Sequence, residues 1–461
     1  MPKRTARDLL ARRSETINRH GGLPSHSHIA SYDFFSQLIQ LNDVEAKNIL
    51  QNKRLRCATD RWSLHKNVWL NSVHEYRHWL DMTTTTFGLE WLSQLADFWV
   101  LSKRVGNLEE SFELRESAVR IERKLKGIHL PSYYSTISTT EAAPPWKYAS
   151  TVGAAFTAEH ILSNQHPIWF LQFSKLDGSH IARQPMSIAS MLEARAVEAE
   201  MFGMKILLES KVVDDMFKVI EEKSFSADLL SRLYTPELTV YSVAAHWHAN
   251  NLLKTDAADA YSISSKLARF CLGAPSKWVQ SIHPSSQFIL AFKDIGLNKM
   301  KLSLEKGDRA AFFFMLAMDT HFGDPSTFDQ DLQKLLLEEW GVDIKTIEQD
   351  AREECNQYIL SIKQFSENDV FGAFVQAIEA NFKQASPITS SIKDYALQIP
   401  AVVLADGELL DIFTSGLGDD ALRREQIFNP LEYVDELFLI EQLVNDLGKY
   451  SSLGEHCFAE V

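Results

Sequence analysis

Two histidines and a glutamate stand at a spacing that could hold and use a metal ion. His74, Glu75 and His78 form an H-E-x-x-H pattern inside residues 66–82, where apolar residues recur at helical intervals. Residues four apart on a helix share a face, so both imidazoles can reach one ion. Two imidazoles suit Zn²⁺, which also needs a third protein ligand and an open position for water. The pattern predicts a site where the metal lowers the pKa of that water and Glu75 takes its proton during attack on a peptide carbonyl.

The same residues have an interpretation that needs no metal. His74 and His78 could be ordinary surface or core histidines, with Glu75 in an ion pair within the helix to Arg77 or Lys66. A match to the three fixed residues of this motif can also arise by chance, and false positives are a known risk of short motifs. The alternative hypothesis is therefore a helical protein-interaction scaffold with a non-catalytic H-E-x-x-H.

The motif resembles that of the zincin metallopeptidases, in which H-E-x-x-H lies on a helix. The resemblance covers the five residues from His74 to His78 and one later segment, a small part of the chain. It implies a zinc-dependent hydrolase whose substrate is a protein or peptide. Arg77 departs from the pattern, because zincin helices usually carry uncharged residues between the glutamate and the second histidine. We expect the Arg77 side chain to face solvent or substrate.

The resemblance also implies where the third ligand lies. In the metzincin branch this ligand lies six residues after the second histidine, where this chain has Thr84, which is not a credible zinc ligand. In the gluzincin branch a glutamate on a later helix completes the site, often as E-x-x-A. Glu193 and Ala196 match that pattern. The gluzincin-like resemblance therefore implies zinc ligands at His74, His78 and Glu193.

Other interpretations of this later segment stay open. Glu200 lies seven residues after Glu193 on the same helical face, so it could be the third ligand instead. Glu198 is another alternative. Ser190 and Glu193 also form the S-x-x-E pattern of a helix capping box, which would give Glu193 no metal role.

Four further residues could support the reaction. Asp81 lies near the face of His74 and His78 and could accept the free N–H of a ligand histidine, or be an ordinary helix-end carboxylate. Tyr241, His246 and His248 are candidate donors to a developing oxyanion, or simply packing residues on a helix.

The elements that position these residues are predicted to be almost all helical. The one strand-like region is the apolar run 168–173, followed by Asp177-Gly178 and a second short strand over 180–183. The fold class is therefore mainly α with one small β-hairpin beside the H-E-x-x-H helix, and an edge strand there could bind an extended peptide. Apolar residues at intervals of three and four predict helices over 32–52, 66–82, 88–105, 107–126, 188–210, 211–223 and 256–272.

Composition shifts divide the chain into three parts. Residues 1–22 carry six Arg or Lys against one Asp and one Glu, and Gly21-Gly22 then breaks the pattern. We expect a basic N-terminal arm over 1–30, a zincin-like catalytic region over 31–210 and a helical C-terminal region over 211–461.

Composition and charge exclude several classes of protein. The chain has 461 residues, and its formal net charge of −14 argues against a general nucleic-acid binder or a protein that docks on anionic membranes. No apolar run is long enough to cross a bilayer. The four cysteines are far apart, and the N-terminus lacks a secretory signal, so we expect a cytoplasmic protein. Its expected partners are a protein or peptide substrate and a regulatory protein.

Overall fold

The structure is a computed structural model, and sixteen α-helices lie in the part of the chain that it describes. The predicted mainly helical fold is confirmed. The basic arm predicted over 1–30 lies outside the described residues except for Ala30. The described residues are 30–54, 58–105, 111–156, 162–209, 215–251, 256–292, 294–318, 322–367, 371–389, 398–410, 427–430 and 433–449.

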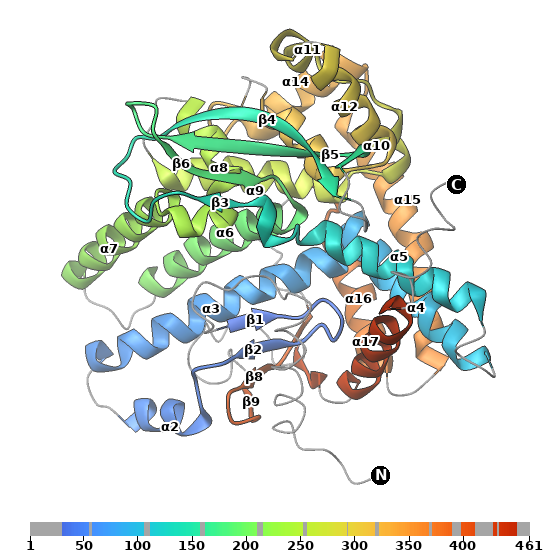
Figure 1. Cartoon of the computed structure of the whole chain (residues 1–461). Coiled ribbons are helices and arrows are strands. Elements are labelled where there is room, and N and C mark those ends of the chain that lie inside the picture. The colour runs from blue at the N-terminus through green and yellow to red at the C-terminus, as the bar shows by residue number, and fades with distance from the viewer. Residues whose placement is uncertain are drawn as a thin grey trace.

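Two long helices pack against each other in the middle of the molecule (Figure 1). Helix α3 spans Ala58–Thr84 and contains the H-E-x-x-H motif, and helix α6 spans Ile188–Glu209. Trp69 Nε1 of α3 donates a hydrogen bond of 2.9 Å to the carbonyl of Gly203 in α6. A Cβ atom at Gly203 would lie 3.1 Å from that indole nitrogen, so the glycine permits the close approach of the two helices.

An antiparallel sheet packs against helices α8 (Thr239–Asn251) and α12 (Asp294–Glu305) (Figure 1). Its strand order is β3-β6-β5-β4, with bounds Thr136–Ile137, His180–Pro185, Leu162–Ser174 and Lys147–Phe156 respectively. The two predicted strand segments fall within β5 and β6, but the prediction of a single hairpin was wrong. Strand β5 lies inside the sheet, paired with β4 and, over Phe170–Ser174, with β6, so the edge strands are β3 and β4. The alanines and glycine of β4 are weak strand formers, so its sequence does not predict the pairing.

A second sheet joins the two ends of the described chain. Its order is β1-β2-β8-β9, and these strands span Ala30–Tyr32, Ile39–Leu41, Val402–Leu404 and Leu409–Leu410. Strand β2 pairs with β8 in parallel. Strands β7 (Ile399–Pro400) and β10 (Ile427–Phe428) form a separate parallel pair.

The helix predicted over 32–52 was wrong in its first half. Between β1 and β2 the chain turns around Asp33, whose carboxylate accepts a hydrogen bond of 3.2 Å from the Phe35 N–H, and Gln37 adopts a positive φ of 56°. Only the second half is helical, as α2. The pairing of β2 with a strand from the far end of the chain overrides the helical periodicity here.

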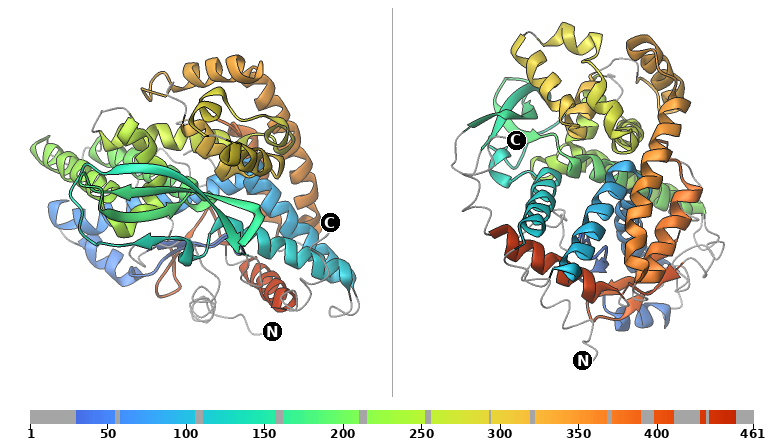
Figure 2. Two further views of the ribbon diagram at one scale, coloured as in Figure 1. Left: turned by 45° about the horizontal axis from the view of Figure 1, so that its top comes forward. Right: turned by 90° about the vertical axis from the view of Figure 1, so that its right-hand side faces the viewer.

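The other helices surround this centre (Figure 2). Helices α15 and α17, late in the chain, pack against α4 and α5 of the first half. The largest buried apolar cluster contains residues from Ala30 to Leu447, on both sides of residue 210, and the three-part division stays a prediction. The bounds are Ala46–Arg54 (α2), Thr86–Arg104 (α4), Phe112–Ile128 (α5), Asp215–Leu233 (α7), Thr239–Asn251 (α8), Ala257–Gly273 (α9), Ser276–Ser281 (α10), Ser286–Ala291 (α11), Asp294–Glu305 (α12), Arg309–Ala317 (α13), Phe328–Trp340 (α14), Ile344–Ile362 (α15), Gly372–Gln384 (α16) and Val434–Lys449 (α17).

Among the described residues, none of the helices combines the length and the apolar character needed to span a bilayer.

Candidate metal centre

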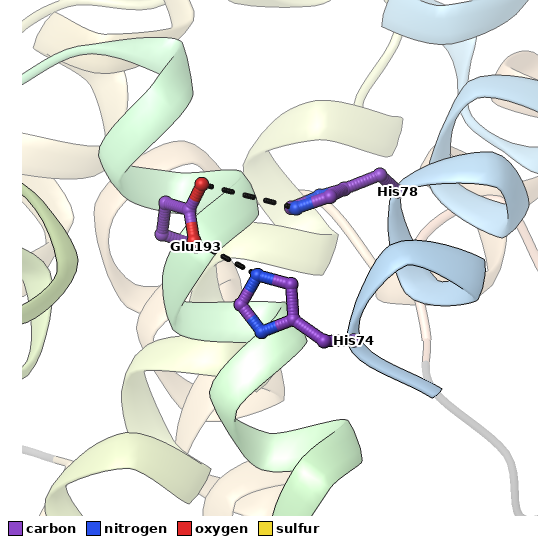
Figure 3. A group of neighbouring side chains, drawn as sticks. All are labelled: His74, His78 and Glu193. Atoms are coloured by element: carbon purple, nitrogen blue, oxygen red, sulfur yellow. Dashed lines mark ion pairs between the residues drawn. The ribbon is translucent and has the colours of Figure 1, made fainter. Parts of the chain in front are cut away.

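Helix α3 presents His74 and His78 toward α6 (Figure 3). The two residues are four apart, so they occupy one face of the helix. Their ring centroids are 5.1 Å apart and the ring planes are nearly perpendicular. The His78 side chain is fully buried, whereas 13% of the His74 side chain is exposed. The two imidazoles therefore line a site that solvent reaches on the His74 side.

Glu193 of α6 completes a group of three possible metal ligands. Its Oε2 lies 3.1 Å from His74 Nε2, and its Oε1 lies 3.8 Å from His78 Nε2. One ligand atom from each of the three side chains falls within 4.8 Å of the others. The structure thus brings together the two motif histidines and the glutamate that the sequence places on a distant helix.

The donor atoms fit a divalent metal ion. Within the described part of the chain, neither ring nitrogen of His78 has a hydrogen-bond partner, although the ring is fully buried. A buried polar atom without a partner costs about 1–3 kcal/mol, and a metal ion at Nε2 would remove this cost for one nitrogen. Two imidazole nitrogens and a carboxylate oxygen are a common protein ligand set for zinc.

The protonation of the two imidazoles differs because their neighbours differ. Burial opposes a charge on His74, but hydrogen bonds to Glu193 and Glu200 outweigh it and raise the pKa of His74 well above its ordinary value. Burial and the charge of His74 lower the pKa of His78 well below its ordinary value. Burial also raises the pKa of Glu193. His78 is therefore neutral, the form that binds metal, and the proton on His74 must leave when a metal binds.

The two alternative third ligands, Glu200 and Glu198, have different partners. Glu200 Oε1 lies 2.7 Å from Nδ1 of His74, on the far side of the ring from Glu193, and its Oε2 accepts a hydrogen bond from Arg232. Burial would raise the pKa of Glu200, but Arg232 and His74 lower it to about 2. Glu198 accepts a hydrogen bond from the Ser265 hydroxyl. Neither belongs to the group of three donors.

The capping interpretation of Glu193 was wrong. Helix α6 begins at Ile188, and Ser187 and Ser190 satisfy each other's backbone N–H groups with their hydroxyls, at 3.2 and 3.0 Å. This reciprocal pair occupies the start of the helix. Glu193 lies further along α6 and its carboxylate is directed at the two histidines.

Glu75 lies on α3 between the two histidines, with 4% of its surface exposed. Its negative charge acts on His74, where it raises the pKa, and on the nearby Tyr32. The Tyr32 ring of β1 lies 5.9 Å from the His78 ring and borders the site on this side. Glu75 is therefore a buried carboxylate within electrostatic range of the metal group but outside its set of ligands.

Asp81 accepts hydrogen bonds from three arginines. Arg77, Arg195 and Arg269 donate to its carboxylate at 2.8, 2.7 and 3.1 Å. The expectation that Arg77 faces solvent or substrate was wrong, because its side chain is 8% exposed and turns to the cluster. The carboxylate at Nδ1 of His74 is that of Glu200 on α6.

Asp81→Asn is expected to lower the free energy of unfolding by about 3–5 kcal/mol. The change removes the charge that compensates Arg195 and Arg269, whose side chains are fully buried. Urea unfolding followed by circular dichroism measures the loss. Glu116→Gln, which breaks an exposed ion pair with Arg120, is the control and should cost at most about 1 kcal/mol. Equal losses in both variants would contradict the role given to Asp81.

The candidate oxyanion donors lie on α8, and none belongs to the group of three donors. The His246 ring stacks on Trp146 at 5.2 Å and lies 4.6 Å from Phe173. Burial lowers the pKa of both His246 and His248 to about 3. Tyr241 is 8% exposed on the same helix. The aromatic contacts of His246 are those of a packing residue.

Sequence reasoning did not identify Arg232 or Tyr32. Arg232 is a basic residue in the last turn of α7, where basic residues are common because they interact favourably with the helix dipole. Tyr32 falls in the segment that was predicted to be helical. Both come from elements whose position depends on long-range packing, so no local signal marks them.

No protein-family model, no curated protein and no solved structure matches the chain.

Proposed function

We propose that this chain is a zinc-dependent peptidase of the gluzincin-like type, with His74, His78 and Glu193 as zinc ligands and Glu75 as general base. One observation carries the proposal. Donor atoms from two helices that are far apart in the sequence converge within 4.8 Å of one another. The donor types are those of a catalytic zinc site with three protein ligands.

The metal ligands and Glu75 have separate roles in the proposed reaction. Zinc held by the three ligands would lower the pKa of a bound water molecule and polarise the peptide carbonyl. Glu75 accepts a proton from the attacking water as the new C–O bond forms, and returns it to the leaving amine nitrogen as the C–N bond breaks. Glu75 lies on α3 next to His74 and is buried, so it is held beside the metal group. The substrate is a protein or peptide, and a cytoplasmic location stays a prediction.

Peptide hydrolysis by the purified chain should require zinc and should not be supported by magnesium. A proteome-derived peptide library is incubated with the protein and its products are identified by mass spectrometry. We expect cleavage that a zinc chelator abolishes, that one equivalent of Zn²⁺ restores and that Mg²⁺ does not, since magnesium prefers an all-oxygen octahedral site.

A sample of the Glu193→Ala variant, purified in the same way, controls for a contaminating peptidase. Cleavage that survives the chelator would contradict the proposal. A zinc-loaded chain that cleaves no peptide in the library would also contradict it and would favour the helical scaffold.

A further inference from the structure

His74 is held from both sides by carboxylates of the same helix. Glu193 faces its Nε2 at 3.1 Å, and Glu200, two turns further along α6, faces its Nδ1 at 2.7 Å. The other oxygen of Glu200 accepts a hydrogen bond of 2.7 Å from Arg232 of α7. Glu200 is 8% exposed and Arg232 is 39% exposed, so the carboxylate is shielded while the guanidinium reaches the surface.

This arrangement decides which nitrogen of His74 is available to a metal. A neutral imidazole carries one N–H, and its other nitrogen keeps the lone pair that binds metal. An ionised carboxylate can only accept hydrogen bonds, so Glu200 requires the hydrogen on Nδ1. Nε2, which faces Glu193, is therefore the nitrogen that gives up its proton when a metal binds, and its lone pair is then directed at the position between the three ligands.

Arg232 fixes Glu200 in turn. Both Glu200 oxygens are engaged, one by the imidazole and one by the guanidinium, so the carboxylate cannot rotate without losing a charge-assisted bond. We propose that Glu200 is a positioning residue for His74 and that Arg232 of α7 holds Glu200 in place. The proposal rests on the proposed function, because it assigns a role at the same metal centre.

Helix α7 offers a matched control. A second ion pair, between Glu221 of α7 and Lys66 of α3, has a length of 2.9 Å and is also largely shielded. A pocket of about 520 Å³ lies between α6 and α7 and is lined, among others, by Met201, Met204 and Phe225. Each ion pair therefore fastens α7 to a neighbouring helix, but only the Arg232–Glu200 pair contacts a metal-group histidine.

The test compares the zinc affinity of Glu200→Gln, Arg232→Gln and Glu221→Gln with that of the wild-type chain, by competition with a chromophoric chelator. We expect a loss of about 10- to 100-fold in Glu200→Gln, the range typical of a residue that orients a metal ligand. Arg232→Gln should lose less, Arg232→Lys should recover part of that loss, and Glu221→Gln should bind as the wild type does. The absorption spectrum of bound Co²⁺ should change in Glu200→Gln and not in Glu221→Gln.

A purely structural role gives a different pattern. It would lower the thermal stability of the metal-free protein in both Glu200→Gln and Glu221→Gln without a difference in zinc affinity or in the Co²⁺ spectrum between them. Wild-type affinity in Glu200→Gln, beside a wild type that binds zinc, would overturn the positioning role alone. Failure of the wild-type chain to bind zinc would overturn the proposed function and this role together.

Discussion

Glu75→Gln is expected to reduce peptide hydrolysis by about 10²- to 10⁴-fold and to leave the zinc content unchanged. The substitution keeps the shape of the side chain but removes its ability to accept a proton. Glu75 lies outside the group of three donors, so the metal site should stay intact. The expected loss therefore falls on the turnover number, and zinc affinity should be that of the wild type.

The measurement pairs turnover on a peptide identified from the library with zinc content by mass spectrometry of the same sample. Glu221→Gln is a suitable control, because it replaces another shielded glutamate that pairs with α3 but contacts no metal-group residue. Circular dichroism checks that both variants fold. Unchanged hydrolysis in Glu75→Gln would rule out its role as general base.

The central helix and its motif could be predicted from the sequence because their signals are local. The apolar periodicity over 66–82 falls inside α3, and the four-residue spacing of His74 and His78 puts them on one face whatever the rest of the chain does. The interpretation of Glu193 came from a family pattern. It depended on α6 being a helix, which its sequence also indicates.

The division of roles between Glu193 and Glu200 could not be predicted. Both lie on the same face of α6, and only the register of α6 against α3 decides which of them meets Nε2 of His74 and which meets Nδ1. That register is set by tertiary contacts such as the close approach of Trp69 to Gly203. No property of the two glutamates themselves distinguishes them.

Long-range contacts also explain the remaining differences. Strands of two or three residues are too short to show a period of two, and β2 becomes a strand because β8 pairs with it. The spacing of Arg77 and Asp81 suggests an ion pair along α3. Arg195 and Arg269, on two other helices, also pair with Asp81. The buried cluster of charges around Asp81 therefore follows only from the packing of the helices.

The proposed peptidase activity depends most directly on whether His74, His78 and Glu193 hold zinc. Metal content is measured by inductively coupled plasma mass spectrometry for the wild type, His78→Ala, Glu193→Ala and Glu198→Gln, each reconstituted with zinc and then desalted. Glu198→Gln is the matched control, because Glu198 lies on the same helix as Glu193 but contacts Ser265. We expect about one zinc ion per chain in the wild type and the control, and none in the other two variants. A wild type without zinc, or a Glu193→Ala variant that keeps it, would contradict the proposed three-ligand zinc site.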